Sequence, residues 1–153
     1  AAHFGWRGAF LAAAAMSFAA APATSIFGDA LRGPARSHAR KVLMLEGCVQ
    51  PGLAPGINSA AARVLDHVGI AVERVHGEHC CGALAHHLGA TDRALEQARA
   101  NVDACCAALD AGAGTIVSSA SACGLMVKDY VRLLAGDGMY AARAERVRRG
   151  CLR

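Results

Sequence analysis

The sequence has few aromatic residues and no long apolar run. Only seven of its 153 residues are aromatic, and five of these precede residue 42. The hydrophobic content of 54% includes 36 alanines, so residues 42–142 must pack mainly on Val, Leu, Ile, Ala and Cys side chains. No run of 18 or more strongly apolar residues predicts a membrane span. The composition also excludes a long repeat array, a collagen-like chain and a disordered polyampholyte, which leaves one small soluble domain.

Acidic residues are scarce at both ends of the chain. Residues 1–41 carry five Lys or Arg and one Asp, and residues 143–153 carry five Arg and one Glu. The middle of the chain carries six basic and ten acidic residues. A nucleic-acid-binding domain places its basic residues on the folded face, so nucleic acid is not an expected partner. The basic ends suit an acidic partner or a membrane surface, but we expect them to be solvated.

Composition divides the chain into three parts. Residues 1–39 are predicted to be an alanine-rich extension and linker, in which residues 10–23 resemble a secretory signal with its cleavage site. An alanine-rich stretch also mimics such a signal by composition alone. We expect the folded, cysteine-rich domain at residues 40–142 and a basic C-terminal tail at residues 143–153.

Strand and helix patterns alternate between residues 40 and 142. Short apolar runs predict strands at residues 41–46, 70–75 and 115–119. Periodic apolar positions predict a helix capped by Asn58, a short helix ending near His87, a longer helix capped by Thr91, and a helix over residues 124–134. This order predicts an α/β fold, a small three-layer Rossmann-like domain with a short parallel sheet.

Four cysteines follow the ends of the predicted strands. Cys48 comes after the first strand, Cys80 and Cys81 after the second, and Cys123 after the third. The carboxyl ends of parallel strands meet at one edge of a sheet, so three loops should bring four thiols together. Adjacent cysteines form a disulfide only in a strained ring, and a soft metal centre suits them better. Four thiols fit zinc or an iron–sulfur cluster, and spacing does not decide between the two.

The thiols at two of these positions should lose their protons readily, which favours such a centre. Cys81 and Cys123 are each followed by glycine and then by a predicted helix. Backbone N–H groups and the helix dipole are expected to favour the thiolate form at these two positions.

The other cysteines and the nearby histidines have simpler explanations. Cys105 lies on the apolar stripe of its helix and Cys106 one step round it, so both should pack in the core, and Cys151 has no expected role. Histidines near the adjacent pair could ligate zinc or hydrogen-bond cluster sulfurs, but we expect them at the surface. These are His79, His86 and His87.

Seven cysteines without a paired-loop framework indicate reduced thiols and a cytoplasmic location. The absence of CxxC spacing at the adjacent pair argues against a thiol–disulfide catalyst.

Several short motifs occur in a characteristic order. Residues 47–51 read Gly-Cys-Val-Gln-Pro, residues 79–84 read His-Cys-Cys-Gly-Ala-Leu, and residues 121–124 read Ser-Ala-Cys-Gly. Together they resemble the cysteine-rich CCG domain, and most closely that of the iron–sulfur subunits of glycolate oxidase (glycolate dehydrogenase). The resemblance covers roughly residues 40–142. Full-length subunits of that family carry two ferredoxin-type cysteine runs and usually two cysteine-rich repeats. This chain has one repeat and no such run, so the resemblance implies a fragment or a degenerate copy.

The resemblance implies a non-catalytic electron-transfer subunit of an oxidoreductase. In that family, flavin-containing subunits oxidise glycolate to glyoxylate, and the iron–sulfur subunit passes electrons toward a membrane acceptor. By position, the ligands of a 4Fe–4S cluster are Cys48, Cys80, Cys81 and Cys123. Ala120 replaces the first cysteine of a CxxC pair found in some CCG domains, so a five-cysteine noncubane centre is not expected. The implied location is cytoplasmic, at the periphery of the inner face of the membrane.

Two alternatives remain open. Related subunits with similar domains serve lactate and glycerol-3-phosphate dehydrogenases. The same thiols could also close a structural zinc site, or belong to a metal-free structural or interaction domain.

Overall fold

The computed structural model describes residues 38–151. The predicted signal-like stretch and most of the alanine-rich extension lie outside these residues. Three parallel strands form one sheet: β1 Arg40–Leu45, β2 Ile70–Arg74 and β3 Thr115–Ser118. Their order is β2-β1-β3, so β1 lies in the centre, with Leu43 paired to Glu73 on one side and to Ile116 on the other.

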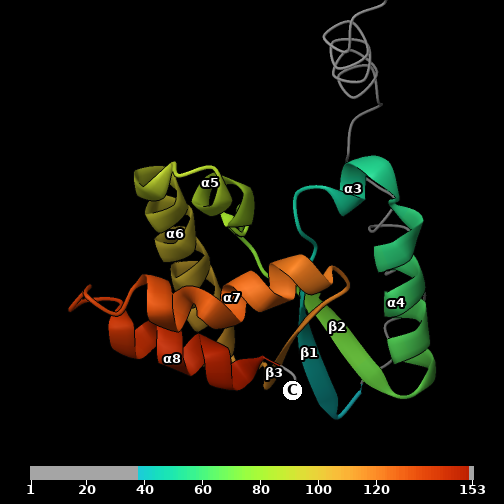
Figure 1. The fold of residues 1–153 in the computed structure, drawn as a ribbon. Helices are drawn as coiled ribbons and strands as arrows, with labels where there is room; N and C mark the ends of the chain where they lie inside the picture. Colours follow the sequence, from blue (N-terminus) through green and yellow to red (C-terminus); the bar gives the residue numbers. More distant parts are fainter. Residues whose placement is uncertain (1–37, 152–153) are drawn as a thin grey trace, which may run out of the picture.

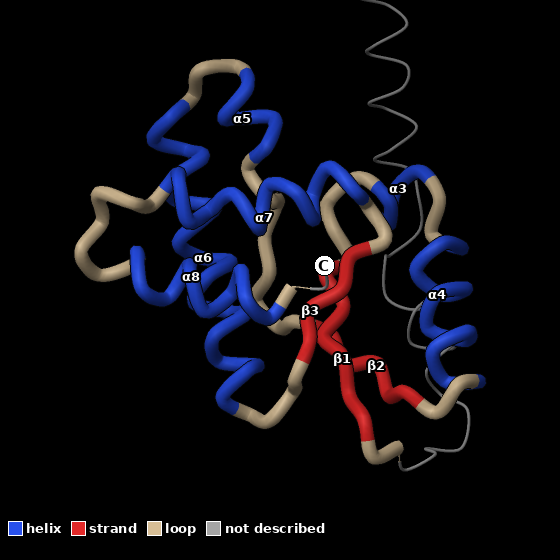
Figure 2. Tube along the Cα trace, turned by 60° about the horizontal axis from the view of Figure 1, so that its bottom comes forward, coloured by secondary structure: helices blue, strands red, loops and turns tan. Residues whose placement is uncertain are grey.

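Helices cover both faces of the sheet. In the described part of the chain these are α3 Gln50–Leu53, α4 Gly56–His67, α5 Ala83–His87, α6 Thr91–Asp110, α7 Ser121–Leu133 and α8 Ala141–Gly150. Figure 1 shows α4 on one side of the strands and α6, α7 and α8 on the other, and the turned view in Figure 2 keeps the sheet between them. The short helices α3 and α5 lie at the carboxyl end of the sheet. The predicted small α/β fold is confirmed.

The two faces of the sheet bury cores of unequal size. Side chains alternate along β1, so Leu43 and Leu45 enter the larger core beneath α6, α7 and α8, while Met44 faces α4. The larger core includes one aromatic ring, Tyr130, besides the aliphatic and cysteine side chains that composition predicts. On the α4 side, the hydrophobic cluster of the described residues contains two buried members, Met44 and Ala62.

Two predicted helix caps are wrong. Asn58 lies inside α4, because the helix begins at Gly56 directly after Pro55, whose φ of −59° already suits a helix. The buried Asn58 side chain instead donates a hydrogen bond to the carbonyl oxygen of Glu46, at 3.1 Å. Thr91 is the first residue of α6 and makes no capping hydrogen bond to the helix backbone.

The expectation of a solvated C-terminal tail is also wrong for residues 143–151. Ala144 and Val147 of α8 are fully buried in the larger core. Cys151 is buried as well, and it pairs with Ile116 in an isolated parallel bridge at the edge of β3. Arg146, Arg148 and Arg149 are exposed on α8, where Arg146 pairs with Asp110 of α6.

None of the helices within residues 38–151 is both long enough and apolar enough to cross a bilayer.

Candidate metal centre

The carboxyl edge of the sheet gathers the four thiols singled out in the sequence. Cys48 lies between β1 and α3, and Cys80 and Cys81 lie between β2 and α5. Cys123 lies in the first turn of α7, because this helix begins at Ser121, earlier than predicted. The Sγ atoms of Cys48 and Cys80 are 3.3 Å apart, and the side chains of Cys81 and Cys123 form a second hydrogen-bonded pair. The thiols thus meet as two neighbouring pairs.

Two glycines shape the loops that carry these thiols. Gly47 has a φ of +73°, and a Cβ at this position would lie 3.6 Å from Sγ of Cys123. Gly82 has a φ of +84°, and a Cβ there would lie 3.3 Å from the carbonyl oxygen of Ala94 in α6. Glycine adopts positive φ at little cost, so the backbone can turn tightly beside both cysteine pairs.

Two of the four thiols, Cys48 and Cys123, have a raised pKa. Burial, together with the neighbouring thiol groups, raises the pKa of Cys48 to about 11. The same causes raise the pKa of Cys123 to about 12. The surroundings of Cys123 thus disfavour the expected thiolate, because burial and the neighbouring sulfurs both raise its pKa.

Glu78 joins two of the cysteine-bearing loops. Its Oε1 accepts a hydrogen bond from the backbone N–H of Glu46 at 2.8 Å, and its carboxylate also accepts from the N–H of Gly47. Burial raises the pKa of Glu78 to about 7. The residue holds the turn before Cys48 against the loop that leads to Cys80. It could not be recognised from the sequence, because a single acidic residue after a strand is typical of a solvated loop.

A buried polar pair lies beneath the adjacent cysteines. Asn101 of α6 and Tyr130 of α7 are 2% and 0% exposed, and both hydrogen-bond to the backbone of residues 79–81. The sequence did contain a signal for Asn101: it falls at the spacing of the buried residues Ala94, Ala98 and Cys105, where an apolar residue is expected.

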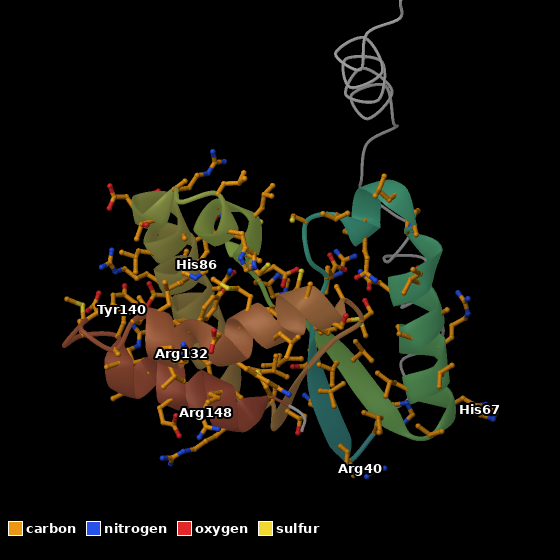
Figure 3. All side chains as sticks on the ribbon, in the orientation of Figure 1. Arg40, His67, His86, Arg132, Tyr140 and Arg148 are labelled. Carbon is orange, nitrogen blue, oxygen red and sulfur yellow. The ribbon has the colours of Figure 1, made fainter. Side chains whose placement is uncertain are left out.

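The remaining candidates lie apart from the four thiols or at the surface. Cys105 and Cys106 are buried in the core, as predicted, and burial raises the pKa of Cys105 to about 12. His79, His86 and His87 are exposed, which confirms the expected surface position, and His86 is labelled in Figure 3.

The donor chemistry of the site fits a soft metal centre. Thiol sulfur is the ligand that iron–sulfur clusters and structural zinc share, and four thiols converge here. Within residues 38–151, no three or more His, Cys, Asp or Glu side chains are arranged around a single point as ligands of one ion.

Comparison with known proteins gives one family and several relatives. The profile of the CCG family, described as a cysteine-rich domain, matches residues 42–128. The chain is 48% identical over 114 residues to the glycolate oxidase iron–sulfur subunit of Escherichia coli (strain K12), a match that covers 74% of this chain and 28% of that protein. It is 30% identical over 105 residues to the probable glycolate oxidase iron–sulfur subunit of Bacillus subtilis (strain 168), covering 69% of this chain and 23% of that protein.

A third relative has a different name. The chain is 27% identical over 105 residues to lactate utilization protein A of Bacillus pumilus (strain SAFR-032), covering 69% of this chain and 42% of that protein. The chain therefore spans about a quarter of the length of the first two relatives and under half of the third. No solved structure matches it significantly.

Proposed function

The chain belongs to the cysteine-rich CCG domain family, and from this we propose that it is the cluster-binding part of an electron-transfer subunit in a glycolate oxidase complex. The observation that carries the proposal is the convergence of four thiols, from two loops and the first turn of α7, at one edge of the sheet. The relatives named as glycolate oxidase iron–sulfur subunits support the same function.

The proposed ligands of a 4Fe–4S cluster are Cys48, Cys80, Cys81 and Cys123. When bound, such a cluster accepts and returns one electron at a time. The chain itself supplies the thiolates, the glycine turns that let the backbone approach them, and the buried hydrogen bonds that hold the loops. Its described residues are assigned no role as acid, base or nucleophile, and flavin-containing partner subunits oxidise glycolate to glyoxylate. Electrons then leave toward an acceptor at the inner face of the membrane, and the chain is cytoplasmic.

A lactate-oxidising complex is the second candidate. The chain is also similar to lactate utilization protein A, although at lower identity. Lactate and glycolate are both 2-hydroxy acids, so the same electron-transfer domain could serve either oxidation.

Anaerobic reconstitution tests the cluster. We expect about four iron and four sulfide per chain, with a broad visible absorption and an EPR signal that change on reduction. The double variant Cys80→Ala/Cys81→Ala should lose all of these. Cys105→Ala/Cys106→Ala is the matched control, because it removes a second adjacent pair that lies in the core, and it should keep the cluster. Stoichiometric zinc without iron would replace the proposal by a structural zinc site, and a chain that takes up no metal would refute both.

The substrate is tested in the intact complex that contains this chain. Addition of glycolate without oxygen should reduce the cluster and change its EPR signal, whereas lactate or glycerol 3-phosphate should have little effect. Reduction by lactate alone would favour the second candidate. A complex in which neither acid reduces the cluster would contradict both.

A further inference from the structure

We infer that Asn101 and Tyr130 are positioning residues that hold Cys80 and Cys81 apart, so that each thiol points toward a different partner at the metal centre. The inference rests on the proposed function, because it concerns the ligands of the proposed cluster.

Three consecutive residues of the cysteine loop are held by this pair. The backbone N–H of His79 donates to Oδ1 of Asn101 at 2.7 Å. Nδ2 of Asn101 donates to the carbonyl oxygen of Cys80 at 3.1 Å, and Oη of Tyr130 donates to the carbonyl oxygen of Cys81 at 2.8 Å. A further hydrogen bond joins the two side chains, from Nδ2 of Asn101 to Oη of Tyr130 at 3.0 Å.

The network has only one consistent orientation. Oδ1 of Asn101 must face the N–H of His79, so both N–H bonds of Nδ2 are left for Cys80 and Tyr130. Tyr130 then accepts from Asn101, and its own proton goes to Cys81. Both side chains are almost completely buried, where an unpaired polar group is costly. The pair therefore fixes the loop in one conformation.

This conformation decides where the two thiols point. The carbonyl group of Cys80 belongs to the peptide that joins the two cysteines, so its bond to Asn101 fixes the plane of that peptide. The bond from Tyr130 fixes the next peptide in the same way. With both peptides held, the Cys80 thiol faces Cys48 and the Cys81 thiol faces Cys123. Both members of the pair are thus available as ligands, and neither is turned toward the other.

Tyr130→Phe is the most direct test. It removes one oxygen and keeps the buried ring, so the carbonyl of Cys81 loses its donor. Tyr140→Phe is the matched control, because Oη of Tyr140 also makes a hydrogen bond, to Asp103 at 3.0 Å, that touches none of the cysteine loops. Figure 3 shows Tyr140 at the end of α7 that lies away from the strand ends.

The readouts are the EPR spectrum of the reduced cluster and the rate at which a chelator removes iron without oxygen. Partners that orient metal ligands typically change affinity by 10- to 100-fold, so we expect Tyr130→Phe to release iron about tenfold faster. Its EPR spectrum should shift, while the protein still unfolds cooperatively. Tyr140→Phe should match the wild type in both readouts.

A folded Tyr130→Phe with wild-type spectrum and release rate would overturn the inference and leave the proposed function intact. If Tyr130→Phe does not fold, Asn101→Asp replaces it, since the carboxylate keeps the acceptor for His79 and loses both donors. Failure of both variants to fold would assign the pair a structural role only, which overturns the inference. A wild-type chain that takes up no cluster would refute the proposed function, and this inference with it.

Discussion

Among single residues, Gly82 is constrained both by its backbone angle and by its surroundings. Alanine at positive φ costs about 1–2 kcal/mol, and a Cβ at Gly82 would also press on the carbonyl oxygen of Ala94 at 3.3 Å. Gly77 has a similar φ of +79°, but no atom lies within 4 Å of the place that a Cβ would take, so Gly77→Ala isolates the backbone cost. We therefore expect Gly82→Ala to lower the free energy of unfolding more than Gly77→Ala does. Urea denaturation of the metal-free protein measures both, and equal losses would show that α6 yields to the extra methyl group.

Individual residues of the site were predictable only where their pattern is local. The four thiols stand out because cysteines follow strand ends, and a parallel sheet brings those ends to one edge. Asn101 and Tyr130 act on residues that lie 21 and 49 positions away in the chain. No local pattern links such partners, so their hydrogen bonds emerge only from the packing of α6 and α7 beneath the cysteine loop.

Among the elements, α8 shows how surface charge can hide a buried face. Its arginines suggested a solvated tail, yet Ala144 and Val147 are three residues apart on one face and fully buried. The strands and the helices α4 to α7 were predictable in order, because their apolar positions give a clear period, whereas the short helix α3 was not predicted. The starts of two helices were predicted too late: α4 begins at Gly56, before Asn58, and α7 begins at Ser121, before residue 124.

Val147→Ala tests whether α8 is part of the core. Removing two buried methyl groups and leaving a cavity should lower the free energy of unfolding by about 2 kcal/mol. Val64→Ala is the matched control, because Val64 lies on α4 with 64% of its surface exposed and should change stability by less than about 0.5 kcal/mol. Chemical denaturation of both variants gives the comparison. Equally small losses of unfolding free energy in the two variants would show that α8 does not contribute to the core.

At the scale of the whole molecule, the site lies between two layers whose hydrophobic cores differ in size. The layer of α6, α7 and α8 shares a core of many buried apolar residues, whereas the hydrophobic cluster beneath α4 has two buried members, Met44 and Ala62. Local opening is easiest where few apolar contacts are buried. Cys48 directly precedes α3 and α4, while Cys123 belongs to α7. A cluster held by all four thiols would therefore connect the layer of α4 to the layer of α6, α7 and α8.

Hydrogen exchange can detect this connection. In the metal-free protein, we expect amides of α4 to exchange through openings of lower free energy than amides of α6 and α7, because α4 buries less apolar surface. Reconstitution should slow exchange in α3 and α4 most, since a ligand that binds only the closed state stabilises the part whose opening would break a bond to it. The Cys80→Ala/Cys81→Ala variant, treated in the same way, should show no such slowing. Protection that rises equally in every helix on reconstitution would mean that the molecule opens as one unit, and that Cys48 is not held by a separately opening layer.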